Sequence, residues 1–153
     1  MDLDLKELSV VTVIENVVEN IRLKYENATV HIHTSKDYGI KADEFHFTNI
    51  IYNLIDNSIK YCENKPEIHI TLSEENKALK LEFSDNGIGI SKKNLSFIFD
   101  KFYRIPSAKS NEVNGFGLGL YYVKKICTLH HWKINAKNNL ENGITITLLI
   151  PLK

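Results

Sequence analysis

The stretch Asn53-Leu54-Ile55-Asp56-Asn57-Ser58-Ile59-Lys60-Tyr61 combines two kinds of side chain on one predicted helix. Its aliphatic residues continue a stripe with helical spacing that begins after Asp43, a residue favoured at helix N-caps. Asn53, Asn57 and Lys60 stand at positions i, i+4 and i+7, so they share one edge of the helix. The sequence therefore predicts a helix that packs through one side and presents two carboxamides and an ammonium group on another.

Helices and strands alternate on both sides of this helix. Apolar residues at three- and four-residue steps predict helices from Val10 to Tyr25, with Ser9 as N-cap, and beyond Gly119. Ser91 is expected to cap a short helix, and a polar stretch without periodicity follows it. Alternating apolar and polar residues predict strands, with a polar turn at 74–77. These strands are expected near 30–32, 68–72, 79–83, 134–137 and 144–150.

This order of elements predicts the fold class. Strands joined by tight turns run antiparallel, so the pattern favours a two-layer α+β sandwich over a doubly wound parallel sheet. With 153 residues, the whole chain (1–153) fits one domain with the helices on one face of one sheet. In the predicted strand, Val30 and Ile32 alternate with His31 and His33, which places the two imidazoles on the face opposite the core.

Composition excludes several classes of function. The 19 Lys and Arg residues balance 19 Asp and Glu residues, so no basic field is available to hold nucleic acid or an anionic membrane. No apolar run approaches the ~18–20 residues that cross a bilayer. Cys62 and Cys127 are interpreted as ordinary thiols, which fits a reducing compartment. Because the net charge is zero, any phosphate binding must depend on a local group of residues and not on the charge of the whole chain.

Asp85-Asn86-Gly87-Ile88-Gly89 follows a predicted strand and is the second stretch of interest. Its glycines allow positive φ and a close backbone approach to a flat group, although such a sequence is also a common turn. A carboxylate only accepts hydrogen bonds, so Asp85 can accept from the amino group of adenine and would reject the carbonyl of guanine. The turn therefore predicts an adenine-selective contact.

Gly115-Phe116-Gly117-Leu118-Gly119-Leu120 opens a predicted helix. Glycines at a helix start expose backbone N–H groups to an anion, which makes this stretch a candidate phosphate cradle. Its spacing fits neither the Rossmann fingerprint nor a P-loop. The carboxamide oxygens of Asn53 and Asn57 are ligands of the kind that suits Mg²⁺, and Lys60 would offset phosphate charge. Each stretch alone also has a plain alternative. It is a solvated helix edge for the stretch with Asn53 and Asn57, and a flexible loop for the glycine-rich stretch.

Together and in this order, the three stretches and Phe99-Asp100-Lys101-Phe102-Tyr103-Arg104 closely resemble the catalytic and ATP-binding domain of bacterial sensor histidine kinases. That domain belongs to the superfamily shared with gyrase-type topoisomerases, heat-shock chaperones and mismatch-repair ATPases. The resemblance spans nearly the whole chain and implies the Bergerat fold, with a mixed sheet and ATP and Mg²⁺ as ligands. It makes Asn53–Tyr61 the N box, Phe99–Arg104 the F box, and the glycine stretches the two glycine boxes.

The resemblance also implies roles for single residues. It makes Asn57 the Mg²⁺ ligand, Asp85 the adenine-reading residue, and Asn53, Lys60 and Arg104 the catalytic residues. Arg104 matches a basic residue that can reach the γ-phosphate, and Thr145 a threonine near adenine, although Ile144 replaces the usual small residue beside it. The remaining nucleotide contacts are expected at Tyr61, Gly87, Gly89, Ile90, Phe102, Gly115, Gly117, Leu118, Gly119 and Leu120.

One residue separates the chemistry of the superfamily members. ATPases that hydrolyse ATP resemble one another in placing Glu four residues before the Mg²⁺-binding Asn, where it serves as general base. Asn53 holds that position here, and a carboxamide cannot take a proton. Asp56 projects roughly 100° around the helix from Asn57, so we do not expect it to be the base. Phosphoryl transfer to a protein side chain is therefore favoured over hydrolysis.

The resemblance also predicts what lies outside the chain. Residues 1–9 are similar to the segment that enters from a dimerisation domain, and residues 91–114 to the ATP lid. None of the six histidines has the sequence context of a phosphoacceptor, and surface or packing roles are expected for them: His31, His33, His46, His69, His130 and His131.

The implied function is transfer of the γ-phosphoryl group of Mg·ATP to a histidine on a separate domain, in two-component signalling. The implied partners are that histidine-bearing dimerisation domain and, through it, a response regulator. The chain alone is expected to be a cytoplasmic monomer without nucleic acid or membrane contact, and its parent a homodimer that can be membrane-anchored. Three alternatives stay open: a nucleotide-binding signalling module without transfer, a stand-alone ATPase, and an anti-sigma-type serine kinase.

Overall fold

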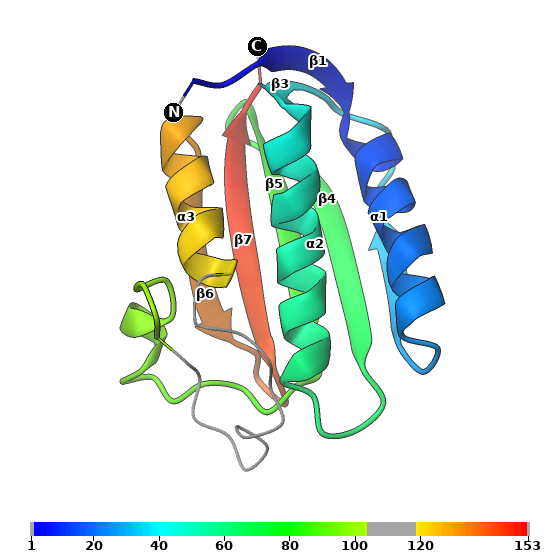
Figure 1. Cartoon of the computed structure of the whole chain (residues 1–153), viewed down its shortest axis with the longest axis vertical. Helices are drawn as coiled ribbons and strands as arrows, with labels where there is room; N and C mark the ends of the chain where they lie inside the picture. The colour runs from blue at the N-terminus through cyan, green and yellow to red at the C-terminus, as the bar shows by residue number, and fades with distance from the viewer. Residues whose placement is uncertain (1, 104–118, 153) are drawn as a thin grey trace.

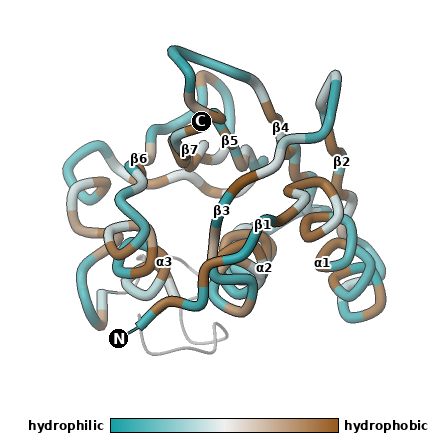
Figure 2. The backbone as a smooth tube through the Cα atoms, turned by 90° about the horizontal axis from the view of Figure 1, so that it is seen from above, coloured by the Kyte–Doolittle hydropathy of each residue, from teal (hydrophilic) through white to brown (hydrophobic). Residues whose placement is uncertain are grey.

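The computed structural model describes residues 2–103 and 119–152, which form a five-stranded sheet with three helices on one face (Figure 1). Viewed from above, helices and sheet form two separate layers (Figure 2). The predicted two-layer α+β sandwich is confirmed. The helices are α1 (Val10–Lys24), α2 (Glu44–Lys60) and α3 (Gly119–Leu129). The strands, in sheet order, are β2 (Thr29–His33), β4 (Glu67–Glu75), β5 (Ala78–Asp85), β7 (Ile144–Pro151) and β6 (Lys133–Asn138).

The sheet is mixed, as expected. β2 runs parallel to β4, whereas the β4–β5, β5–β7 and β7–β6 pairs are antiparallel. The β4–β5 turn is tighter than the predicted four residues. It consists of Asn76 and Lys77, which both have positive φ, 49° and 64°. Two left-handed residues are the signature of the type I′ turn, whose twist matches that of the flanking strands.

The core lies between the two layers. Alternate residues of β4, β5 and β7 point to the helices, and the opposing stripe of α2 is almost completely buried. The residues that meet at the centre of this core include Phe47, Ile50, Ile51, Leu54, Ile55, Ile68, Ile70, Leu81, Phe83 and Leu148. No helix within the described ranges is long and apolar enough to cross a membrane.

A second, two-stranded sheet was not predicted from the sequence. β1 (Leu5–Ser9) pairs antiparallel with β3 (Gly39–Asp43), from Leu5 opposite Asp43 to Ser9 opposite Gly39. The residues of β1 are exposed or only partly buried, so no apolar alternation marks the strand in the sequence.

The prediction of a short helix capped by Ser91 is wrong. The carbonyl of Ser91 accepts hydrogen bonds from the N–H groups of Asn94 and Leu95, but regular helix does not continue from there. Only a 3₁₀ helix, η1 (Leu95–Phe97), forms, and it has no side-chain cap. Successive bonds over three residues, such as Phe97 N–H to the Asn94 carbonyl, give tight turns in place of an α-helix.

The two long helices begin at the predicted N-caps, and that of α2 also ties down the start of the chain. Ser9 accepts from Thr12 N–H at 3.1 Å, and Asp43 Oδ1 accepts from His46 N–H at 3.1 Å. The second oxygen of Asp43 accepts from Asp4 N–H at 2.9 Å. This bond from Asp4, followed by that from His46, holds the pKa of Asp43 below its ordinary value. Asp43 therefore joins β1, β3 and α2.

We expect Asp43→Ala to lower the free energy of unfolding by about 1–2 kcal/mol, because it removes the cap of α2 and leaves two N–H groups without this acceptor. Urea denaturation at neutral pH measures the change. Asp4→Ala is the matched control, because it keeps the N–H that Asp43 accepts and loses only an exposed ion pair with Lys6 at 3.7 Å. Its effect should stay below about 0.5 kcal/mol. Equal losses in the two variants would contradict this role for Asp43.

Candidate nucleotide site

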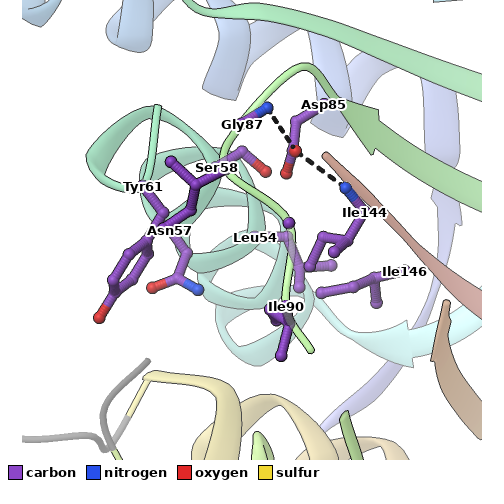
Figure 3. Close-up of a pocket in the computed structure, with 11 residues that line it drawn as sticks. Leu54, Asn57, Ser58, Tyr61, Asp85, Gly87, Ile90, Ile144 and Ile146 are labelled. Carbon is purple, nitrogen blue, oxygen red and sulfur yellow. Dashed lines mark hydrogen bonds between the residues drawn. The ribbon is translucent and has the colours of Figure 1, made fainter. Parts of the chain in front are cut away.

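A pocket with about 330 Å³ of empty space, part of it open to solvent, lies between the C-terminal part of α2 and the adjacent ends of β5 and β7 (Figure 3). It combines an aliphatic wall with a small number of polar groups, which is the usual composition of a small-molecule site. Most of the lining comes from the N box and the first glycine box, which are brought together as predicted. The lining residues are Leu54, Asn57, Ser58, Tyr61, Asp85, Gly87, Ile88, Gly89, Ile90, Ile144 and Ile146.

Asp85, the last residue of β5, is held in place by two backbone amides. Its Oδ1 accepts from Gly87 N–H at 3.0 Å and from Ile144 N–H at 3.1 Å (Figure 3). Desolvation raises the pKa of Asp85 above its ordinary value, against these two bonds and one from the Ser58 side chain, which lower it. The result is a fixed acceptor in a partly dehydrated position.

The glycine turn after Asp85 packs against the end of α2. A Cβ on Gly87 would lie 2.8 Å from the carbonyl oxygen of Tyr61, so no other residue fits without a shift. The same carbonyl accepts from Ile88 N–H at 3.1 Å. Gly89 has φ of +76°, in the region where side chains are unfavourable. Gly87 is therefore required by its contact with the end of α2 and Gly89 by its positive φ, while the predicted close approach of this turn to a flat group stays a prediction.

Sequence reasoning missed three residues, from the end of β6 and the loop before β7, that shape this site. A Cβ on Gly143, which has φ of +85°, would lie 2.0 Å from the backbone oxygen of Asp85. Asn139 Nδ2 donates to that same oxygen at 2.9 Å. Asn138 brackets Ile90, since its Oδ1 accepts from Ile90 N–H at 3.0 Å and its Nδ2 donates to the Ile90 carbonyl. The Asn-rich loop before Gly143 was the available signal.

Thr145 does not line the pocket. Its hydroxyl donates to Asn139 Oδ1 at 2.5 Å, and its side chain is buried. Ile144 and Ile146, which alternate with it on β7, face the pocket. Thr145 thus orients Asn139, which in turn binds the backbone of Asp85. The replacement of the usual small residue by Ile144 leaves the bond to Asp85 intact, because that bond comes from the backbone N–H.

The predicted polar edge of α2 is divided between three neighbours. Asn57 faces the pocket, as does Tyr61 at the end of the helix. Asn53 donates from Nδ2 to the Asn49 carbonyl at 2.7 Å, and its Oδ1 lies 3.3 Å from a Cβ built on Gly119. Asn53 therefore lies against the start of α3. Lys60 Nζ lies 3.0 Å from Asp56 Oδ2, one turn earlier on the helix.

Asp56 belongs to a different cluster from Asn57. It is 9% exposed and accepts a hydrogen bond from the Tyr25 hydroxyl at 2.5 Å. Lys24 and Lys60 form ion pairs with it at 3.7 and 3.0 Å. These contacts tie α2 to α1 and agree with the expectation that Asp56 is not a general base.

Several predicted residues fall elsewhere. Arg104, Gly115, Gly117 and Leu118 lie outside the described residues, and the segment expected as a lid is described only as far as Tyr103. Leu120 is buried in α3. Phe102 is 63% exposed, has φ of 66°, and is not part of the pocket lining.

Comparison with known proteins identifies the family of the chain. Residues 42–153 match the model of the family described as histidine kinase-, DNA gyrase B- and HSP90-like ATPases. Among curated relatives, the chain is 41% identical over 157 residues to the sensor protein RprX of Bacteroides fragilis, covering 98% of the chain and 30% of RprX. It is 28% identical over 151 residues to the histidine-protein kinase ArlS of Staphylococcus epidermidis, covering 98% of the chain and 33% of ArlS. The chain thus spans about a third of these relatives.

Solved structures share the fold. The mycobacterial sensor histidine kinase MprB superposes with a TM-score of 0.87 at 21% identity, over 95% of this chain and 97% of that one. The catalytic domain of the histidine kinase ThkA gives a TM-score of 0.84 at 24% identity, over 97% and 96% of the two chains. The family match covers the glycine turn, the end of α2 and β7, which build the pocket. The chain therefore belongs to the family of histidine kinase-, DNA gyrase B- and HSP90-like ATPases.

Proposed function

We propose that this chain binds Mg·ATP in the pocket between α2 and the ends of β5 and β7, and transfers the γ-phosphoryl group to a histidine on a separate domain. The observation that carries the proposal is Asp85, a partly dehydrated acceptor held by Gly87 and Ile144 N–H groups at 3.0 and 3.1 Å. Its place beside a glycine turn and an aliphatic wall suits a flat base with an exocyclic amino group.

Base selection follows from the hydrogen-bonding character of Asp85. An ionised carboxylate has about four acceptor positions and no donor, so it can accept from the adenine amino group in addition to its internal bonds. Guanine would present a carbonyl oxygen there, and two acceptors would face each other. Leu54, Ile90 and Ile146 supply the apolar surface against which the ring would pack.

The polar edge of α2 fits the phosphate end of the ligand. Asn57 faces the pocket and can offer a neutral oxygen to Mg²⁺, with Asn53 one turn away. Mg²⁺ bound there would offset charge on the phosphates. Lys60, and Arg104 beyond the described residues, would neutralise further charge, and the glycine-box amides would orient the phosphates. Positioning and charge neutralisation are sufficient for a loose phosphoryl-transfer transition state.

The choice of transfer over hydrolysis rests on the absence of a suitable general base among the described residues at the pocket edge. Position 53 is a carboxamide, and Asp56 is occupied by Tyr25, Lys24 and Lys60. Among the described residues that line the pocket, Asp85 is the only carboxylate, and it is assigned to adenine binding. Water activation therefore has no suitable group there.

The relatives suggest the biological setting. ArlS is named a signal transduction histidine-protein kinase, and ThkA has been solved in complex with the response regulator TrrA. By analogy, we assign this chain to two-component signalling, with a histidine-bearing dimerisation domain and a response regulator as partners. Residues 1–9 would enter from that domain, and residues 91–114 would form the ATP lid. The parent would be a homodimer, and this domain a cytoplasmic monomer.

We expect Asp85→Asn to weaken ATP binding by about 100-fold or more, because an amide N–H₂ group would face the adenine amino group as a second donor. A fluorescent ATP analogue measures the affinity. Glu82→Gln is the matched control, since it changes a carboxylate on the other face of the same strand and should leave affinity unchanged. Unchanged affinity of Asp85→Asn would contradict the adenine assignment.

The Asp85→Asn variant should not lose thermal stability. The raised pKa of Asp85 means that the ionised carboxylate costs stability above its folded pKa, and that this cost disappears below the ordinary value of 3.8. Asp85→Asn removes the cost at neutral pH, while the amide oxygen can still accept from Gly87 and Ile144. The melting temperature at neutral pH should therefore stay equal or rise, and the difference from wild type should shrink as the pH is lowered.

Labelled ATP tests the transfer step directly. The chain is mixed with [γ-³²P]ATP, Mg²⁺ and a histidine-bearing helical domain from a sensor histidine kinase, and the acceptor should gain an acid-labile, alkali-stable label. Asn57→Ala should slow labelling by at least about 10-fold and remove the Mg²⁺ dependence of ATP affinity. Asn64→Ala, an exposed Asn in the loop after α2, is the control. Steady ATP hydrolysis by the chain alone, without label on the acceptor, would favour an ATPase.

A further inference from the structure

Three imidazoles and one carboxylate gather on the sheet face opposite the helices. His31 on β2 lies directly across from His69 on β4 in the parallel pair, and His33 and Glu67 are two residues away on the same strands. These side chains alternate with Val30, Ile68 and Ile70, which are buried towards the helices. This agrees with the expectation that His31 and His33 lie away from the core. In Figure 1 the helices lie in front of the sheet, so the sheet face opposite them is turned away from the viewer.

The polar atoms of the cluster have the spacing of a metal-ligand set. His69 Nε2 lies 2.9 Å and His31 Nε2 3.8 Å from Glu67 Oε1, and one ligand atom from each of the three residues lies within 4.8 Å of the others. Metal–ligand distances of about 2.0–2.2 Å place neighbouring ligands of a tetrahedral ion roughly 3.3 Å apart. The separations of 2.9 and 3.8 Å bracket that value, and the third lies within 4.8 Å, so the three ligand atoms are near the spacing that an ion requires.

His33 supplies the support that a ligating histidine needs. Its Nε2 lies 2.8 Å from His69 Nδ1, the ring nitrogen of His69 that does not face Glu67. A metal-bound histidine usually donates its second N–H group to a neighbour, which fixes its tautomer and orientation. With the metal on His69 Nε2, His69 Nδ1–H would donate to His33 Nε2. The rings of His31 and His69 also stack, with centroids 4.6 Å apart.

We propose that His31, His69 and Glu67 bind a divalent transition-metal ion of the Zn²⁺, Ni²⁺ or Cu²⁺ type, with His33 as the residue that positions His69. Two imidazoles and one carboxylate match the preferences of these ions and not those of Mg²⁺, so this site is distinct from the nucleotide pocket. The side chains of His31, His69 and Glu67 are 43%, 40% and 53% exposed, so an ion can enter from solvent. A water would fill the remaining coordination position.

The metal site lies at the β2 edge of the sheet, so a bound ion would stabilise that edge. β2 is the outermost strand of the sheet beside β4, and a metal ligated from both strands would fasten this edge. An ion that binds only the folded chain stabilises it by mass action. Glu67 also donates its backbone N–H to Asn86 Oδ1 at 2.8 Å, so the ligand next to the metal is anchored to the first glycine box.

Isothermal titration of the nucleotide-free chain with Zn²⁺ at a pH near 8, where free imidazoles are mostly neutral, tests the proposal. We expect one ion per chain and a rise in melting temperature with Zn²⁺ that excess chelator reverses. His33→Ala should weaken binding about 10- to 100-fold. His31→Ala and His69→Ala should each weaken it further, because each removes a ligand, and circular dichroism checks that these exposed-face variants fold.

Two controls separate this site from other metal-binding groups. His131→Asn removes an exposed histidine with φ of 63°, a conformation that Asn tolerates, and should leave Zn²⁺ affinity unchanged. Cys62→Ser should also bind one Zn²⁺ with wild-type affinity. No Zn²⁺ binding by wild type, binding that survives in His69→Ala, or binding lost in Cys62→Ser would each overturn the proposal. Mg²⁺ up to millimolar concentration should not displace Zn²⁺, whatever the chain does with ATP.

Discussion

The hydrogen bond from Ile144 N–H to Asp85 Oδ1 connects the parts of the nucleotide pocket. The β5–β7 ladder ends at the pair Ser84 and Thr145, so this bond replaces the next backbone rung with a side chain. The same oxygen accepts from Gly87 N–H and thereby starts the turn that passes over the end of α2. One carboxylate therefore sets the positions of β7, the glycine turn and the aliphatic wall.

The backbone around Asp85 can pack this closely because Gly87 and Gly143, which lie next to it in space, have no side chains. Gly87 leaves room for the Tyr61 carbonyl at the end of α2, and Gly143 leaves room for the Asp85 backbone itself. Asn139 Nδ2 then donates a hydrogen bond to that backbone oxygen. These contacts all come from the chain itself, so the fold orients the acceptor, and a fixed acceptor loses less conformational entropy on binding than a mobile one.

The sequence could predict features that depend on local chemistry. The stripe of α2, its Asp43 cap and the alternation in β4, β5 and β7 follow from periodicity and capping, and they place Asn57 and Asp85 at one pocket. The requirement for Gly143 depends on a contact with a residue 58 positions earlier, and β1 pairs through a strand without apolar alternation. The polar edge of α2 was predicted as one unit, but tertiary contacts direct Asn53 to α3 and Lys60 to Asp56.

The ion pair of Lys60 with Asp56 is compatible with a role of Lys60 at the phosphates, because Asp56 has other partners. The Lys60 side chain is 31% exposed and that of Asp56 13%, so the ammonium group can be solvated while the carboxylate depends on its protein partners. Moving Lys60 towards a phosphate would leave Asp56 with the Tyr25 hydroxyl and with Lys24, so the buried carboxylate keeps hydrogen-bonding and ionic partners. Removing both lysines would be costly, because a charge would then be buried beside a single neutral donor. Under the proposed function, Lys24 would allow Lys60 to change partners and would connect α1 to the pocket through one carboxylate on α2.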